Sequence, residues 1–122
     1  MERILVVDDE AQIVRLLQKY FASKGYEVST AGSGLEAIEK VKDVRPHVVL
    51  LDILMPDMGG IDTLKEIKKI DPQIGVIMIT AVIDEEIARR ALELGADDYI
   101  TKPIDFDYLE TCVMVKLAQL PG

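Results

Sequence analysis

The chain has 122 residues, of which 49% are hydrophobic, and its formal net charge is −8 at pH 7. This length predicts one domain, residues 1–122, and the apolar content excludes a disordered tail. Because nucleic-acid backbones and anionic lipids are also negative, the charge argues against direct binding of nucleic acid or of a membrane surface. The single cysteine, the absence of a signal-peptide pattern and the lack of a bilayer-length apolar run predict a cytoplasmic protein.

Short apolar runs alternate with helical patterns along the chain. Residues 3–7 predict a buried strand, and apolar residues at helical spacing from 13 to 21 predict an amphipathic helix that ends by Gly25. Four more strands are predicted over 26–31, 47–52, 75–80 and 97–100. The helices predicted after them lie around 35–41, 61–67, 87–94 and 106–120.

Five strands that are each followed by a helix predict an α/β fold, a doubly wound parallel sheet with helices on both faces. Two five-stranded orders compete, and the flavodoxin-like order 2-1-3-4-5 suits the length. In such sheets, ligands bind beyond the carboxyl ends of the strands, where the strand order reverses. A functional site is therefore expected at the ends of the first and third strands.

Polar residues gather at the carboxyl ends of the predicted strands. Asp8 and Asp9 follow the first strand, Asp52 ends the third, Thr80 ends the fourth, and Lys102 follows the fifth. Two carboxylates ~4 Å apart repel by about 4 kcal/mol at an effective dielectric constant near 20, and one lysine cannot neutralise three acids. Either the acids take up protons or a cation lies among them. We predict an oxygen-liganded divalent cation, and such a site suits Mg²⁺.

A metal, a carboxylate, a hydroxyl and an ammonium around one cavity predict phosphoryl chemistry. Mg²⁺ and Lys102 would neutralise phosphoryl oxygens, and the Thr80 hydroxyl would donate to another. An aspartate can attack phosphorus and form an acyl phosphate, and Asp52 is the best candidate because it stands alone at the central strand end. Asp8 and Asp9 are better placed to hold the metal.

The stretches "VVDDE", "LLDILMPDMGG", "MITA" and "YITKP" stand in this order, each at a predicted strand end. In these stretches the sequence resembles the receiver domain of two-component response regulators, over nearly the whole chain. The resemblance implies that Asp52 accepts a phosphoryl group from a histidine kinase, a phosphotransfer protein or a small phosphodonor. It also implies that Asp9, Asp52 and the backbone carbonyl of Leu54 ligate Mg²⁺, while Asp8 acts largely through water.

The same resemblance implies a switch. Thr80 would turn towards the phosphoryl group, Tyr99 would rotate inwards, and Lys102 would pair with a phosphoryl oxygen. The Lys102–Pro103 peptide bond is expected to be cis. The one departure from the family pattern is Gly59, where an acid is common, and it affects only a helix cap. We expect the domain to catalyse no reaction beyond its own phosphoryl transfer and slow autodephosphorylation.

The last predicted helix carries two apolar stripes. Its core face is predicted to contain Phe106, Leu109, Val113, Leu117 and Leu120. The second stripe consists of Tyr108, Cys112 and Val115, with Met114 beside it. A monomer has little use for two such stripes. We expect the second stripe, with the neighbouring helix 87–94 and strand 97–100, to contact another subunit or an output domain.

Two apolar residues near the predicted site concern the lifetime of an acyl phosphate. Leu54 and Val82 stand two residues after Asp52 and Thr80, and neither can orient an attacking water. We therefore predict a long-lived phosphorylated state. The only histidine, His47, opens the third strand at the opposite edge of the sheet and is not expected to carry a phosphoryl group.

Simpler structural roles and three rival functions compete with the switch. Taken singly, the aspartates could be turn formers or helix caps, Thr80 a strand former and Lys102 a solvent-facing side chain, but their coincidence at one sheet edge favours a site. A phosphoester hydrolase commonly has a second acid where this chain has Leu54, and usually a cap domain. A receiver that only binds proteins usually lacks an acid or the lysine. A nucleotide-binding sheet would need a glycine-rich loop after the first strand.

Overall fold

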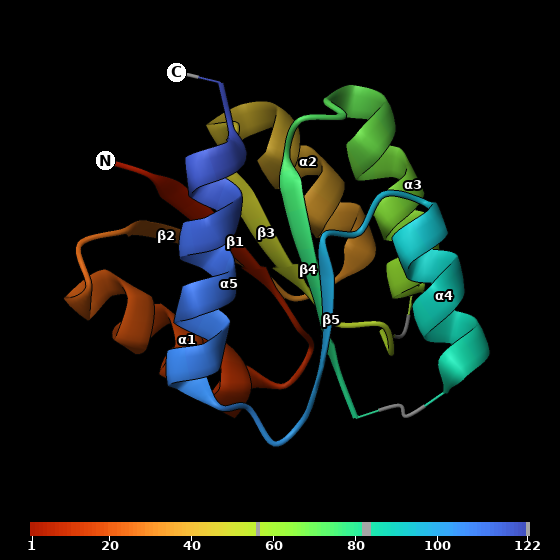
Figure 1. Ribbon diagram of the computed structural model, residues 1–122, viewed down its shortest axis with the longest axis horizontal. Coiled ribbons are helices and arrows are strands. Elements are labelled where there is room, and N and C mark those ends of the chain that lie inside the picture. Colours follow the sequence, from red (N-terminus) through yellow and green to blue (C-terminus); the bar gives the residue numbers. More distant parts are fainter. Residues whose placement is uncertain (56, 82–83, 122) are drawn as a thin grey trace.

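The computed structural model describes residues 1–55, 57–81 and 84–121 (Figure 1). Strands and helices alternate along these ranges, as the sequence predicts. In chain order the elements are β1 (Arg3–Val7), α1 (Ala11–Ser23), β2 (Glu27–Ala31), α2 (Gly34–Val44), β3 (Val48–Leu51), α3 (Gly60–Ile70), β4 (Gly75–Thr80), α4 (Glu85–Glu93), β5 (Asp98–Thr101) and α5 (Phe106–Gln119).

All neighbouring strands pair in parallel, in the order β2-β1-β3-β4-β5, which confirms the predicted flavodoxin-like order. The reversal of strand order therefore lies between β1 and β3. In their register Val7 lies opposite Leu51, so the residues that follow each strand, Asp8 and Asp52, leave the sheet side by side. The topology thus places two acids together at one edge.

Helices cover both faces of the sheet (Figure 1). Leu5 and Val7 of β1 point into a core cluster that contains buried residues of α2, α3 and α4. Ile4 and Val6 point into the opposite cluster, with buried residues of α1 and α5. Because the central strands are buried on both faces, they read as continuous apolar runs rather than as alternating ones.

The fifth strand begins one residue later than predicted, at Asp98 rather than Asp97. The Asp97 backbone amide donates to the Val76 carbonyl (2.8 Å), and an Asp97 carboxylate oxygen accepts from the Val76 amide (2.8 Å). The Asp97 carboxylate therefore accepts the Val76 amide hydrogen bond in place of a backbone carbonyl, and regular strand pairing starts with Asp98.

The last helix packs through Leu109 and Val113, which are buried as predicted. Cys112, expected on the second stripe, is half-buried against the same core, and its thiol contacts an Asp98 carboxylate oxygen (3.1 Å). Burial, followed by the contact with Asp98, raises the pKa of the Cys112 thiol to about 11. The exposed apolar side chains described on α5 are therefore Tyr108, Met114 and Val115.

His47 lies at the amino ends of β1 and β3, opposite the acids, as predicted. Its Nδ1 accepts a hydrogen bond from the Arg3 backbone amide (2.9 Å), and its own amide donates to the Arg3 carbonyl (2.9 Å). Within residues 1–55, 57–81 and 84–121, no helix combines the length and the apolar character needed to cross a bilayer.

Candidate functional site

Asp8 and Asp52 form the buried base of the site. The Asp8 amide donates to the Ala31 carbonyl (3.2 Å) and the Asp52 amide to the Val7 carbonyl (3.0 Å), so both residues continue the sheet hydrogen bonding beyond the strand ends. Asp8 is only 4% exposed and Asp52 only 5%. The backbone therefore fixes two poorly solvated carboxylates at the point where the strand order reverses.

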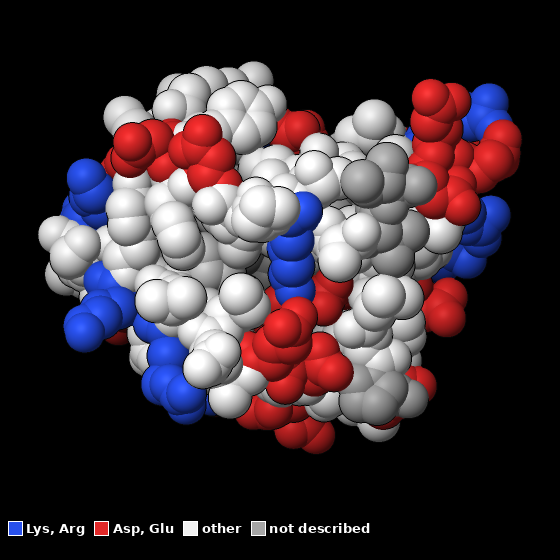
Figure 2. Space-filling model, turned by 90° about the horizontal axis from the view of Figure 1, so that it is seen from below, with Lys and Arg blue, Asp and Glu red and all other residues white. Residues whose placement is uncertain are grey.

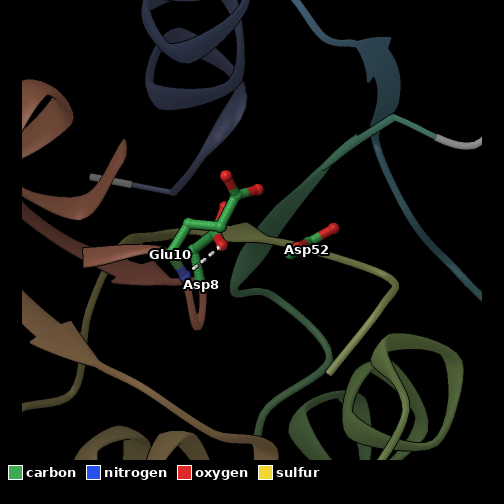
Figure 3. A group of neighbouring side chains, drawn as sticks. All are labelled: Asp8, Glu10 and Asp52. Carbon is green, nitrogen blue, oxygen red and sulfur yellow. Dashed lines mark hydrogen bonds between the residues drawn. The ribbon is translucent and has the colours of Figure 1, made fainter. Parts of the chain in front are cut away.

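Glu10 joins these two acids (Figure 3). One carboxylate oxygen from each of Asp8, Glu10 and Asp52 lies within 4.8 Å of the others. The Glu10 amide donates to Asp8 Oδ1 (2.9 Å), a local turn between the strand and α1. We assigned Glu10 no role from the sequence. The available signal was a third acid directly after the strand, within reach of an aspartate-stabilised turn.

Asp9 is exposed and is not one of the three clustered carboxylates. Its direct metal ligation therefore stays a prediction, as does the water-mediated role of Asp8. The Leu54 amide donates to Asp52 Oδ1 (3.3 Å), so the backbone of Leu54 lies beside the predicted nucleophile. The role of the Leu54 carbonyl stays a prediction too.

Lys102 is the cation of the site. Its Nζ lies 3.0 Å from Asp8 Oδ2, 2.8 Å from Glu10 Oε1 and 3.6 Å from Asp52 Oδ2. The Lys102 amide donates to the Thr80 carbonyl (2.8 Å), which anchors the residue at the end of β4, and the bond to Pro103 is cis, as predicted. Figure 2 looks onto this edge of the sheet, where acidic surface at the centre lies directly against basic surface.

The electrostatics of the site follow from this geometry. Burial raises the pKa of the Asp52 carboxyl, and the charge of Asp8 raises it further, while Lys102 and the backbone amides of Leu54 and Ile53 oppose the rise. Burial lowers the pKa of Lys102, but hydrogen bonds to Glu10 and Asp8 and the nearby carboxylate charges outweigh it, so the net pKa is raised. The ammonium is therefore charged at neutral pH.

The residues fit a hard divalent cation. The three clustered groups offer only oxygen ligands, and within the described part of the chain no histidine or cysteine joins them. One ammonium faces three carboxylates, so a second positive charge would reduce their mutual repulsion. The site could hold a metal ion with Asp8, Glu10 and Asp52 around it.

Of the predicted switch residues, Thr80 lies on β4 and Tyr99 on β5, and Pro103 follows β5. Thr80 is fully buried at the end of β4 and is paired in register with Thr101. Tyr99 of β5 is paired with Met78 of β4. Its half-buried side chain packs against the core cluster that contains buried residues of α2, α3 and α4. Burial, and then the charge of Asp84, raises the pKa of Tyr99. The movements proposed for Thr80, Tyr99 and Pro103 stay predictions.

Comparison with known proteins identifies relatives over most of the chain. The family described as "Response regulator receiver domain" matches residues 4–114. The chain is 45% identical over 115 residues to the transcriptional regulatory protein ZraR of Klebsiella oxytoca, covering 94% of this chain and 26% of that protein. It is 43% identical over 103 residues to the chemotaxis protein CheY of Thermotoga maritima, covering 84% and 86%. The chain thus spans about a quarter of the regulator and most of CheY.

Solved structures agree with this. A CheY-like receiver domain protein from Methanospirillum hungatei JF-1 superposes with a TM-score of 0.91 at 33% identity, covering 98% of this chain and 96% of that one. The CheX–CheY–BeF3–Mg²⁺ complex from Borrelia burgdorferi matches with a TM-score of 0.90 at 36% identity, covering 95% and 89%.

Replacing Asp52 with asparagine should stabilise the fold at neutral pH. Because folding raises the pKa of Asp52, the folded state loses stability as the pH rises from the unfolded-state pKa to the folded-state pKa, and the full penalty is present above the folded-state pKa. The penalty is absent at low pH, where the group is protonated in both states. We expect Asp52→Asn to gain about 1 kcal/mol at pH 7, or roughly 4 °C in Tm, since Lys102 offsets part of the repulsion.

Thermal unfolding without divalent cations, at pH 7 and pH 4, measures this difference. The gain should shrink at pH 4. Asp9→Asn is the matched control, since Asp9 is an exposed acid of the same stretch, and it should leave Tm nearly unchanged. A loss of stability in Asp52→Asn at pH 7 would show that the Lys102 ion pair outweighs burial and repulsion.

Proposed function

The chain belongs to the response regulator receiver domains and so is a phosphoacceptor signalling switch, and on that premise we propose that it takes a phosphoryl group onto Asp52 with Mg²⁺ as cofactor. The donor is the phosphohistidine of a histidine kinase or phosphotransfer protein, or a small phosphodonor. The observation that carries this proposal is the buried Asp52 carboxylate at the central strand end, beside Asp8 and in contact with the Lys102 ammonium.

In the transfer, a carboxylate oxygen of Asp52 forms a bond to phosphorus while the bond from phosphorus to the imidazole nitrogen breaks and its electron pair stays on that nitrogen. A bound Mg²⁺ ion, held by Asp8, Asp52 and the neighbouring carboxylates, would neutralise charge on the phosphoryl oxygens. Support for this ion comes from the oxygen-only donor set and from the related complex solved with BeF3 and Mg²⁺.

Lys102 and Thr80 then respond to the new charge. Lys102 exchanges a carboxylate partner for a phosphoryl oxygen, and the Thr80 hydroxyl donates to another. Since Tyr99 lies on the strand paired with the end of β4, this rearrangement biases the Tyr99 region between two states. A differential interaction of a few kcal/mol is enough to shift such an equilibrium. We place this switch in the cytoplasm.

The output surface in this proposal is formed by α4, β5 and α5. β5 is the edge strand, with α4 on one face and α5 on the other. Leu92 of α4 and Tyr108, Met114 and Val115 of α5 are at least half exposed. We propose that this surface contacts a second subunit or an output domain. The much greater length of relatives such as ZraR supports an output domain.

Phosphorylation of Asp52 is testable by intact-mass measurement after incubation with acetyl phosphate and Mg²⁺. We expect one added phosphoryl group, which is lost in Asp52→Asn and when a chelator removes the metal. Donor consumption far beyond one equivalent on a minute scale would instead favour a phosphoester hydrolase. An unchanged mass in the wild-type protein, whose folding circular dichroism would check, contradicts the proposed switch.

The phosphorylated state should be long-lived because Leu54, which is 58% exposed beside Asp52, cannot orient a water molecule. Leu54→Asn should speed the decay of the phosphorylated mass by about tenfold, since a positioned polar group assists attack by water. Leu54→Met is the apolar control and should leave the rate unchanged. Equal rates in all three proteins would refute this role of Leu54. Val82, which we paired with Leu54, lies outside the described residues.

If the output surface contacts a second subunit, phosphorylation should change the oligomeric state of the protein in solution. Phosphorylation should shift the protein towards a dimer in light scattering, and Val115→Lys should prevent the shift because it places a charge in an apolar contact. Leu35→Lys, an equally exposed position on α2, should still dimerise. A monomer at high concentration in both phosphorylation states would leave only the output-domain version.

A further inference from the structure

The loop that follows Asp52 is tied to a helix that makes no direct contribution to the site. Asp57 lies in this loop, between β3 and α3. Its Oδ1 accepts a hydrogen bond from the Gly34 amide (3.2 Å) and its Oδ2 accepts one from the Leu35 amide (3.1 Å). Gly34 and Leu35 are the first two residues of α2. A residue more than twenty positions away in sequence therefore binds the start of α2.

This contact is electrostatically favourable. The first amides of a helix have no partner within the helix, and its amino end carries partial positive charge, so a carboxylate there is stabilised. A hydrogen bond from the Met58 backbone has the largest effect and lowers the pKa of Asp57; burial opposes it, and hydrogen bonds from Leu35 and Gly34 add to the lowering, so the net pKa is lowered. Asp57 is therefore ionised at neutral pH.

The helix already has a local cap. Ser33 is the N-cap of α2, and its hydroxyl oxygen accepts from the Glu36 amide (3.1 Å). The first three amides of α2 therefore all have acceptors: Asp57 of the distant loop accepts from the first two, and the adjacent Ser33 accepts from the third. Besides stabilising this helix end, the Asp57 contact has a second consequence, because it joins the β3–α3 loop to α2 and so holds the loop.

Close backbone packing joins Asp57 to the nucleophile. A β-carbon on Gly34 would lie 2.8 Å from the Met58 carbonyl oxygen, and one on Gly60 would lie 2.3 Å from the Asp52 carbonyl oxygen. The Gly60 amide also donates to the Ile53 carbonyl (2.8 Å). The start of α2 therefore lies against Met58 and the start of α3 lies against Asp52 and Ile53, so these described parts of the loop have little space to shift while Asp57 is bound.

We propose that Asp57 is a positioning residue, whose carboxylate pins the β3–α3 loop to α2 and so fixes the backbone of Asp52 and Leu54 for metal binding. The metal part of this inference rests on the proposed function. Asp57 is not one of the clustered carboxylates, so in this proposal it acts on the metal site through the loop. Its removal releases the loop, and with it the Leu54 backbone that lies against Asp52.

Two variants separate loop positioning from helix stability. Asp57→Ala removes the tie between loop and helix, and Ser33→Ala removes the local cap from the same helix end. Both should lower the melting temperature. Asp57→Ala should weaken Mg²⁺ binding in titration calorimetry about tenfold, as is typical when a residue that orients a metal ligand is lost. Ser33→Ala should leave the Mg²⁺ affinity unchanged, and Asp57→Asn, which keeps one acceptor oxygen, should restore part of it.

Amide hydrogen exchange without metal gives a second readout. The amides of Leu54 and Gly60 should exchange faster in Asp57→Ala and at the wild-type rate in Ser33→Ala. Equal losses of Mg²⁺ affinity in the two variants, or unchanged exchange in Asp57→Ala, would overturn the positioning role. A wild-type protein that binds no Mg²⁺ would overturn the proposed cofactor instead, and the exchange rates alone would then decide whether Asp57 holds the loop.

Discussion

The structure depends on one unbalanced contact, in which the buried carboxylates of Asp8 and Asp52 share the Lys102 ammonium. Charges with so little access to water interact strongly, because solvent screens them poorly. Here Glu10 adds a third acid, so one cation serves three anions. Such a site responds strongly to any added charge. A bound divalent cation would relieve the repulsion, and in the proposed switch a phosphoryl group would attract the lysine away from its present partners.

The rest of the fold keeps this arrangement in place. Residues 4–7 of β1 and all of β3 are buried on both faces and are paired with each other, which fixes the register that brings Asp8 and Asp52 together. A densely packed interior does not deform gradually, so in the proposed switch a change in charge would be transmitted as a shift between discrete arrangements. The long-range hydrogen bonds of Asp57 and the close approach at Gly60 extend the same rigidity to the loop behind the nucleophile.

In the proposed switch, Lys102 is the residue that would change partners between the resting and the phosphorylated state. In the described structure its closest partner is Glu10, an exposed side chain that water can replace at little cost, while Asp8 is buried. The lysine can therefore leave Glu10 more easily than it can leave Asp8. Its backbone amide donates to the Thr80 carbonyl, which places the residue that carries the ammonium at the end of β4, next to the strand that carries Tyr99. One residue thus connects the acidic site to the proposed output surface.

The amino-acid sequence alone predicts the element order, the parallel sheet and the edge at which the acids gather. These features are local: a buried strand is an apolar run, a helix repeats every 3.6 residues, and a side chain after a strand must emerge at the carboxyl edge. Asp8, Asp52, Thr80 and Lys102 were found in this way. The folded chain was needed to show that Glu10 rather than Asp9 lies with the clustered carboxylates, and that Asp57 binds α2. Those contacts depend on side-chain direction and on partners that lie 92 and 23 residues away in sequence, and no local pattern encodes such distances.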